Sequence, residues 1–507
     1  MDPRTVHIVG YLVGLFFALE PSYIHPDEHF QSLEILAHLF YGSAATVPWE
    51  FAARNAARSF GPLYVAYGPL FYLYRRLGSP APGLALLYLV RLQNYIVYTC
   101  VYMLALQFLL RSKLDRAKAT FYISTSYVTW TYQTHSFSNS LETCALLIVL
   151  SLFQVLILDA RAPRHNHYRT SAILGFVIAF GFFNRITFLG FIALPAIPTL
   201  RKFYLGHLKS LLICATTFCL SCCAFIYADT VLYETPHWCI APLNNLEYNL
   251  QSSNLALHGV HPRYTHILIN IPQMLGPLVT YFISRKQKIN LTMLSCISGL
   301  LFLSAFQHQE LRFLIPLMPL LCASINLSNL SSSVRNRYIT RTWLVFNVVF
   351  GVIMGSLHQR GVLTAIEEST KNNAPIDVHV WWKTYSPPTW LYSNHNLVVS
   401  TTNIHDGEEN LDDVNFQIIR NHVVDLKGCD YELFEVAMHN FLELNASVRV
   451  FIPKSTDTLF TNFRSRNPTV RIDKVWETRL NLDLDHLDFT DLSTLIPGFL
   501  IYEVAAT

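Results

Sequence analysis

Residues 6–34 read VHIVGYLVGLFFALEPSYIHPDEHFQSLE, an apolar stretch that runs directly into a group of ionisable side chains. The apolar part, residues 6–19, has the composition of a membrane span, and residues 20–22 offer no clear cleavage site for a signal peptidase. We interpret it as a first span of about 14–16 residues, which its flanks can lengthen. Carboxylates and imidazoles just outside a span are costly to place unless they serve a function.

The composition of the whole chain indicates a membrane protein with several spans. Of its 507 residues, 52% are hydrophobic and only 14% are charged, whereas soluble domains carry about 25% charged residues. The formal net charge of +3 is too small to indicate a nucleic-acid partner. Most of the ten cysteines lie in apolar runs and act there as small hydrophobes, while a disulfide between Cys239 and Cys429 stays open.

Apolar segments recur from the N-terminus to about residue 358, and about eleven of them could cross a membrane. They lie near residues 6–20, 84–110, 117–132, 141–158, 170–183, 186–200, 209–228, 265–283, 291–306, 311–328 and 342–358. If these spans alternate, the Lys- and Arg-rich connectors all fall on one side, which the positive-inside rule makes cytoplasmic. The stretch 170–200 is decisive, because one long helix there, in place of two helices around Asn184-Arg185, would invert everything downstream.

This orientation places the long loops 21–83 and 229–264, and everything after the last span, on the lumenal side. From about residue 371 the chain becomes polar and carries short alternating runs, which predict strands of a mixed α/β region. The runs lie at 396–400, 414–419, 447–452 and 469–472. We therefore divide the chain into a multi-span catalytic domain, 1–370, and a lumenal C-terminal domain, 371–507, in which Asn445 begins a glycosylation sequon.

The sequence His25-Pro26-Asp27-Glu28-His29 is the most informative motif in the chain. Proline disfavours helix at His25, so a helix can begin at residue 28 with Asp27 at its N-cap. Capping alone is one explanation for Asp27. A zinc or manganese site built from the two carboxylates and two imidazoles is another, but Pro26 breaks the helical spacing that would make them converge, and we expect no metal.

Further polar groups gather at the lumenal ends of spans. A single Arg or Glu at such a position is most often an interfacial anchor, but several clusters on one face, together with the motif at 25–28, indicate a site at the membrane surface. The groups are Ser136-Phe137-Ser138-Asn139-Ser140 with Glu142, Asn184-Arg185, Asp229, and His308-Gln309-Glu310-Leu311-Arg312.

In combination these motifs resemble glycosyltransferase family 22. The resemblance is carried by residues 25–34, Ser136 to Ser140, His258-Gly259-Val260-His261-Pro262-Arg263 and His308 to Phe313, and it runs from about residue 10 to 360. It implies an all-α polytopic membrane protein of the GT-C fold with about 11 transmembrane helices, followed here by the smaller mixed α/β region. One departure is visible, because Gln309 stands where many relatives have lysine.

The resemblance also implies an activity. Family members are multi-pass enzymes of the endoplasmic reticulum membrane that transfer mannose from dolichyl-phosphate mannose, and the motif at 25–28 is most similar to that of the enzymes adding an α-1,2-linked fourth mannose to the third mannose of the GPI-anchor precursor. The expected partners are these two lipids and the membrane, with no cofactor and no obligate protein subunit. Two alternatives stay open: another family 22 mannosyltransferase, for the third GPI mannose or the N-glycan precursor, and a lipid-linked sugar transporter.

The chemistry of the family assigns expected roles to individual residues. Inverting transfer needs a general base opposite the leaving phosphate, and relatives place that acid at Asp27, with Glu28 as the second candidate. Charge on the leaving phosphate needs cations, among which Arg312 and Arg185 are the strongest candidates, although each could simply bridge to a neighbouring span. The further residues expected to bind substrate or shape the site are His25, His29, His261, Arg263, His308, Asn139, Glu142 and Asp229.

Overall fold

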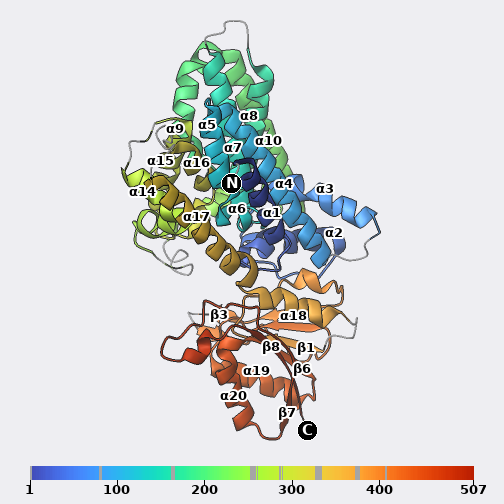
Figure 1. Ribbon diagram of the computed structural model, residues 1–507. Coiled ribbons are helices and arrows are strands. Elements are labelled where there is room, and N and C mark those ends of the chain that lie inside the picture. The colour runs from blue at the N-terminus through green and yellow to red at the C-terminus, as the bar shows by residue number, and fades with distance from the viewer. Residues whose placement is uncertain are drawn as a thin grey trace. The chain divides into compact units, whose positions relative to one another are not determined.

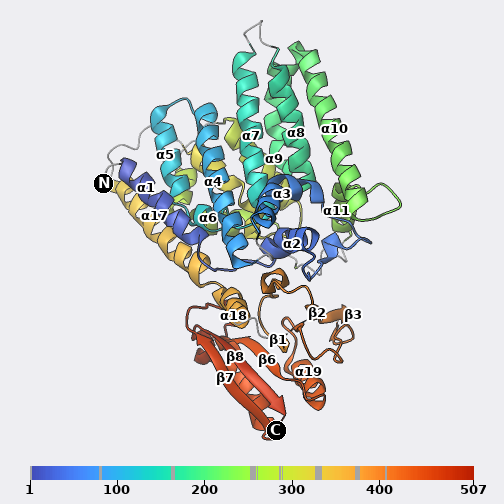
Figure 2. The same ribbon diagram turned by 90° about the vertical axis from the view of Figure 1, so that its right-hand side faces the viewer.

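A computed structural model describes residues 3–78, 83–160, 166–251, 259, 261–284, 287, 289–325, 334–371, 377–405 and 408–506. The chain forms two compact units (Figures 1 and 2). The first comprises Met1–Ala18, Pro48–Pro69 and Val90–Phe350, and the second Leu19–Val47, Leu70–Leu89 and Gly351–Thr507. The expected boundary between a catalytic and a lumenal domain at residue 370 stays a prediction, since the packing of the chain does not test where each function resides.

The first unit is helical. Its described helices are α1 (Pro3–Ala18), α5 (Lys113–Ser124), α6 (Tyr127–Trp130), α7 (Ser138–Asp159), α8 (Tyr168–Asn184), α9 (Phe188–Lys202), α10 (Leu208–Leu232), α11 (Ala241–Leu250), α13 (Ile271–Leu275), α14 (Val279–Ser284), α15 (Leu291–Ser304) and α16 (Leu317–Ser324). Three more, α3 (Phe60–Arg76), α4 (Leu84–Leu109) and α17 (Val334–Val352), contribute residues to both units. Helices α7, α8 and α10 run side by side (Figure 2), and α8 approaches α10 so closely that a Cβ on Gly175 would lie 2.3 Å from the carbonyl oxygen of Cys214.

Among the described residues, six helices are long and apolar enough to cross a membrane, and two further apolar helices, Ile8–Ala18 and Leu291–Ser304, are shorter. The six are Leu84–Leu109, Ser138–Asp159, Phe188–Gly206, Leu208–Leu232, His266–Ser284 and Val334–Leu357. The polytopic all-α prediction is thus confirmed, but the count of about eleven spans is not. Two of the predicted segments are interrupted: 117–132 breaks between α5 and α6, and 311–328 begins with a 3₁₀ turn, Leu311–Leu314, before α16.

The stretch 170–200, on which the predicted orientation depends, forms two helices. Helix α8 ends at Asn184, and Arg185 adopts an extended conformation with φ −154° and ψ 129°. Helix α9 then begins at Phe188. The prediction of two helices around Asn184-Arg185 is therefore confirmed, and the break places Arg185, whose side chain is only 9% exposed, at a helix junction.

The second unit contains a six-stranded sheet in the order β2-β5-β1-β6-β8-β7 (Figure 1). Its strands are β1 (Val378–Trp381), β2 (Val398–Thr401), β5 (His422–Asp425), β6 (Val448–Pro453), β7 (Val470–Thr478) and β8 (Phe499–Ala506). Strands β2, β5, β1 and β6 are parallel, whereas β8 pairs antiparallel with both β6 and β7. A hairpin of β3 (Asn403–His405) and β4 (Glu408–Asn410) stands apart from this sheet. The mixed α/β prediction for the C-terminal region is confirmed.

The two faces of this sheet are covered differently, because side chains alternate along a strand. On one face Val378 and Val380 pack in a core with α19 (Tyr431–Glu443) and α20 (Asp457–Arg466). On the other face Trp381 stacks on Phe451, with ring centroids 4.2 Å apart. This second face meets the 3₁₀ helix η8 (Thr389–Tyr392).

Three of the four predicted C-terminal strands begin within one or two residues of the expected position. The run at 414–419 is wrong, because it forms turns instead of a strand. Its backbone closes onto itself, with Val414 N–H donating to Leu411 O at 2.9 Å, and the Asn415 side chain accepts from Gln417 N–H at 3.1 Å. Such side-chain-to-backbone bonds compete with strand pairing.

Candidate active site

The motif at 25–28 lies in the second unit at the start of a continuous helical stretch. The helix begins at Asp27 itself, one residue earlier than expected, and widens into a π-helix, His29–Leu33, before α2 (Glu34–Tyr41). Pro26 forms its first turn, since its carbonyl oxygen accepts the N–H of His29 at 3.0 Å and of Phe30 at 3.1 Å. Single π turns of this kind occur often at functional sites.

The two carboxylates of the motif have different surroundings. Asp27 is 21% exposed, accepts a hydrogen bond from Gln31 Nε2 at 2.5 Å and lies 3.5 Å from His25 Nδ1. Glu28 is buried, and its Oε1 accepts the backbone N–H of Ile24 at 3.0 Å. Glu28 therefore fixes the backbone just before the helix, whereas the Asp27 carboxylate is accessible.

The four ionisable groups of the motif form two separate pairs. Asp27 faces His25, whose side chain is 34% exposed, and Glu28 faces His29 at 3.8 Å in the interior. Within the part of the chain that the structure describes, no three His, Cys, Asp or Glu side chains lie close enough to bind a metal ion. The expectation of a metal-free site stays a prediction.

Arg185, in the first unit, lies at the junction of α8 and α9 and contacts α7. Its Nε lies 3.4 Å from Glu142 Oε2 and donates to Thr187 Oγ1 at 3.3 Å, and its Nη1 donates to Ser138 Oγ at 3.0 Å. Burial lowers the pKa of Arg185 to about 10, which leaves it protonated at neutral pH. The bridge to a neighbouring helix is thus present, but a guanidinium carries five N–H donors, and these contacts engage only Nε and Nη1.

Arg312 forms a second cationic group next to Arg185. The Phe313 ring faces both guanidinium groups, at 5.3 Å from the Arg185 carbon and 5.5 Å from that of Arg312. Arg312 pairs with Glu310 through both Nε and Nη2, and Glu310 also contacts His308 Nε2 at 2.8 Å. Burial alone would lower the pKa of His308, but the hydrogen bond and charge of Glu310 outweigh it and raise that pKa.

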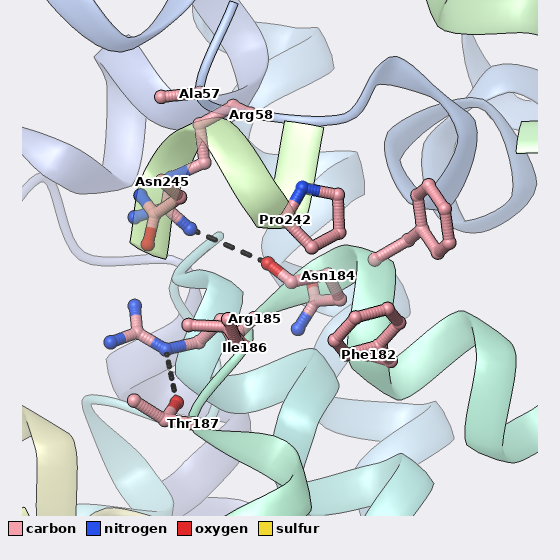
Figure 3. A pocket seen from close by; sticks show the side chains of 10 residues that line it. Ala57, Arg58, Phe182, Asn184, Arg185, Ile186, Thr187, Pro242 and Asn245 are labelled. Atoms are coloured by element: carbon pink, nitrogen blue, oxygen red, sulfur yellow. Dashed lines mark hydrogen bonds between the residues drawn. The ribbon is translucent and has the colours of Figure 1, made fainter. Parts of the chain in front are cut away.

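Arg58, which was not among the predicted site residues, belongs to the same network of arginines and glutamates. Its Nη1 donates to the carbonyl oxygen of Asn184 at 3.4 Å (Figure 3). Its Nη2 pairs with Glu50 at 3.1 Å. Asn184 in turn donates to the carbonyl oxygen of Ser138 at 2.8 Å. Arg58 precedes the start of α3 inside the long loop 21–83, where a lone arginine gives no local sequence signal.

Other predicted site residues lie around this network or outside it. His261 is close to His308, with ring centroids 6.3 Å apart, whereas the Arg263 side chain is exposed. Asn139 is buried at the start of α7. Asp229 is buried in α10 and accepts the N–H of Phe60 at 2.8 Å, so it fixes the first turn of α3. His258 and Val260 lie outside the described residues.

Gln309, where the family resemblance led us to expect lysine, is held by backbone groups. Its Oε1 accepts the N–H of His266 at 2.9 Å, and its Nε2 donates to the carbonyl oxygens of Arg263 at 3.2 Å and Phe306 at 3.0 Å. An ammonium group has no acceptor and could not bind the His266 N–H. The glutamine therefore connects two loops and adds no charge.

Two pockets of the first unit lie next to each other and share Ala57 in their lining. The smaller, about 40 Å³, lies between Arg58, Arg185 and the α11 residues Pro242 and Asn245, and it has room for a few water molecules (Figure 3). The larger is an open groove of about 630 Å³ between the loop at 49–57 and the segment 235–251. Its wall includes Trp49 stacked on Tyr248 with centroids 3.8 Å apart, and Trp238, which is 70% exposed. Polar members of its lining are Arg54, Asn55, His237, Asn244, Glu247 and Gln251.

Residues 5–394 match the model of the Alg9-like mannosyltransferase family. The chain belongs to this family. A full-length relative, GPI mannosyltransferase 4 of Eremothecium gossypii, is 44% identical over 504 residues, covering 99% of this chain and all of the relative. GPI mannosyltransferase 4 of Saccharomyces cerevisiae is also 44% identical, covering 97% of both chains.

The fold of this family member is that of a known group of solved structures. The crystal structure of ArnT from Cupriavidus metallidurans bound to undecaprenyl phosphate superposes with a TM-score of 0.54 at 11% identity, covering 98% of this chain and 97% of that one. This similarity concerns the fold alone. The similarity confirms the predicted GT-C architecture. Together with the six long apolar helices among the described residues, it shows that the mannosyltransferase is a multi-pass membrane protein.

Proposed function

We propose that this protein transfers an α-1,2-linked fourth mannose from dolichyl-phosphate mannose to the third mannose of the GPI-anchor precursor, in the endoplasmic reticulum membrane and without a metal. The full-length similarity to fungal GPI mannosyltransferase 4 is the observation that supports it most directly. The lumenal orientation is supported by the basic connectors of the sequence and by the break at Arg185, which gives two helices where that orientation requires two.

In this proposal Asp27 is the general base. The acceptor hydroxyl attacks the anomeric carbon of the β-mannosyl phosphate, its proton passes to Asp27, and the bond from that carbon to the phosphate oxygen breaks, so that the configuration inverts. The accessibility of Asp27 supports this assignment over Glu28, which is buried on a backbone N–H. The neighbouring His25 holds the backbone beside this carboxylate, because its Nδ1 accepts the N–H of Asp27 at 3.2 Å.

The leaving phosphate gains negative charge as the bond breaks, and Arg185 and Arg312 are proposed to stabilise it. Guanidinium groups suit phosphate oxygens because their parallel N–H bonds bind two oxygens at once. Their carboxylate partners, Glu142 and Glu310, hold both groups in place before the donor binds. Such preorganised charge costs little reorganisation when the reaction proceeds.

The groove of about 630 Å³ is the proposed contact for the acceptor glycan. Sugar rings present C–H faces that pack on aromatic rings, and their hydroxyls bind amide and carboxylate groups. Trp238, Asn244 and Glu247 offer both kinds of surface.

The proposed function is tested with microsomes given labelled dolichyl-phosphate mannose and a three-mannose GPI precursor, with and without EDTA. We expect a four-mannose product that an α-1,2-specific mannosidase shortens, and no effect of EDTA. A requirement for GDP-mannose would overturn the donor, and loss with EDTA that manganese restores would overturn the metal-free mechanism. Transfer only to a two-mannose GPI precursor or to an N-glycan precursor would assign the protein to another activity in the family.

A further inference from the structure

The C-terminal α/β region has no role in the proposed chemistry, yet within the second unit it packs directly on the helical stretch that carries Asp27. The contacting segment is residues 385–392, which includes η8. We propose that this segment is a clamp that positions Asp27, so that the C-terminal region takes part in mannosyl transfer through the geometry of the base. This inference rests on the proposed role of Asp27.

The first contact of the clamp is made by Glu34, the residue directly after the π-helix. Glu34 is fully buried, and its Oε1 accepts a short hydrogen bond from Thr389 Oγ1 and another from Thr46 N–H at 3.1 Å. Its Oε2 lies 3.4 Å from the N–H of Trp390. A buried carboxyl is costly unless it is hydrogen-bonded, so these partners fix both the end of the π-helix and η8 in one arrangement.

The second contact is between two buried side chains, His29 and Trp390. The Trp390 Nε1–H donates to His29 Nδ1 at 3.4 Å. Nδ1 is then an acceptor, so the proton of the neutral ring is on Nε2, the atom that faces Glu28 Oε1 at 3.8 Å. Trp390 thereby sets the tautomer of the residue two positions after Asp27.

The third contact holds the chain just before the motif. Tyr23 donates from Oη to the carbonyl oxygen of Ser386 at 3.0 Å, and its ring meets Tyr385 edge-on at 5.3 Å. Its carbonyl oxygen accepts from His358 Nδ1 at 2.9 Å. Residues on both sides of Asp27 are therefore tied to the same C-terminal region.

The clamp is itself anchored in the sheet. Tyr392 Oη, in η8, accepts from Trp381 Nε1 at 3.1 Å and lies 3.2 Å from His379 Nδ1. Both partners belong to β1, a central strand paired on each side, so the segment 385–392 stands on a rigid support. A carboxylate at the exposed start of a helix is positioned more precisely when such a support fixes its neighbours.

Thr389→Val tests the clamp, because valine has the shape of threonine but no hydroxyl for Glu34. We expect kcat to fall about 10- to 100-fold while KM for donor and acceptor stays within about twofold, since the base moves and the substrates still bind. Thr389→Ser, which keeps the hydroxyl, should restore most of kcat. Trp390→Phe, which removes the Nε1–H, should give a similar fall, and the matched Trp476→Phe on edge strand β7 should leave kcat unchanged.

Hydrogen exchange of the same variants separates positioning from folding. In Thr389→Val, amides of residues 23–34 should exchange faster, whereas those of β6 and β8 should not change. Wild-type kcat in Thr389→Val, a fall matched by loss of folded protein, or a fall equal in Trp476→Phe would each overturn the clamp. Failure of the wild-type protein to transfer mannose would instead overturn the proposed function, and the exchange result would still decide whether the clamp exists.

Discussion

Replacing Asp27 by asparagine separates chemistry from structure at the motif. Asparagine keeps the size of the side chain, and its Oδ1 can still accept the hydrogen bond from Gln31 Nε2. The side chain is partly exposed, so the free energy of unfolding should change by less than about 1 kcal/mol. An amide cannot take the proton of the acceptor hydroxyl, and loss of a general base costs about 10²- to 10⁴-fold in kcat.

Glu28 provides the comparison, because its role in the structure is different. Glu28→Gln retains an oxygen for the Ile24 N–H, so its activity should stay within about threefold of wild type. Glu28→Ala leaves that buried N–H without an acceptor, which costs about 1–3 kcal/mol and should lower the amount of folded protein.

The assay is single-turnover mannosyl transfer in microsomes that contain equal amounts of each variant, determined by immunoblot. Complementation of cells lacking the protein, at low expression, gives an independent measurement. Near-normal transfer by Asp27→Asn together with an inactive Glu28→Gln would refute the reasoning and move the base to Glu28. Loss of both proteins from the membrane would refute the structural separation of the two carboxylates.

Four further outcomes are expected. Arg185→Lys keeps the charge but not the paired N–H donors, so kcat should fall about 10²-fold. The control Arg111→Lys, in a connector predicted to be cytoplasmic, should leave kcat unchanged. Equal activity of the two variants would show that Arg185 does not bind the phosphate. Trp238→Ala should raise KM for the acceptor roughly tenfold and leave KM for the donor unchanged, and an unchanged acceptor KM would exclude the groove. Asn445 is exposed, so we expect it to carry a glycan in the lumen. The wild-type chain should then lose mass on endoglycosidase treatment, and Asn445→Gln should not. An unglycosylated, cytosol-accessible C-terminus would contradict the proposed membrane orientation. Burial raises the pKa of Glu34 to about 7, above its ordinary 4.5, so its stabilising effect is present below pH 4.5 and is lost as the pH rises toward 7. The free energy of unfolding in detergent should fall over this range by at most about 3 kcal/mol, and Glu34→Gln should abolish this fall; parallel curves for the two proteins would contradict the burial.

Much of the architecture could be predicted from the sequence, because apolar length and charge placement are local properties. The break at Asn184-Arg185 was visible as two short apolar runs around polar residues, and it is present. The span count was not predictable to the same degree. Runs such as 117–132 are apolar enough for a span, but Thr125 and Ser126 carry hydroxyls that bond to the backbone within the run and divide it into two helices.

The candidate site was predictable as a set of residue types and not as a set of contacts. The sequence did not distinguish the accessible Asp27 from the buried Glu28, nor did it show which carboxylate pairs with each arginine, since both depend on the groups that each side chain meets in the fold. Arg58 was missed because a lone arginine in a long loop has no local signal, and its contact with Asn184 spans 126 residues of sequence. The proposed clamp on Asp27 joins residues still farther apart in the sequence, because Glu34 and Thr389 are separated by 355 positions.

The π-helix His29–Leu33 makes the angular position of Asp27, the proposed general base, depend on a residue count. One residue more or fewer between Asp27 and Glu34 turns one end of the stretch by about 100° relative to the other. With Glu34 held by Thr389, a deletion within 29–33 would swing the Asp27 side chain to a different face without altering its chemistry. A chimaera that exchanges this motif between family members therefore has to carry the whole stretch from Tyr23 through Glu34 as one cassette.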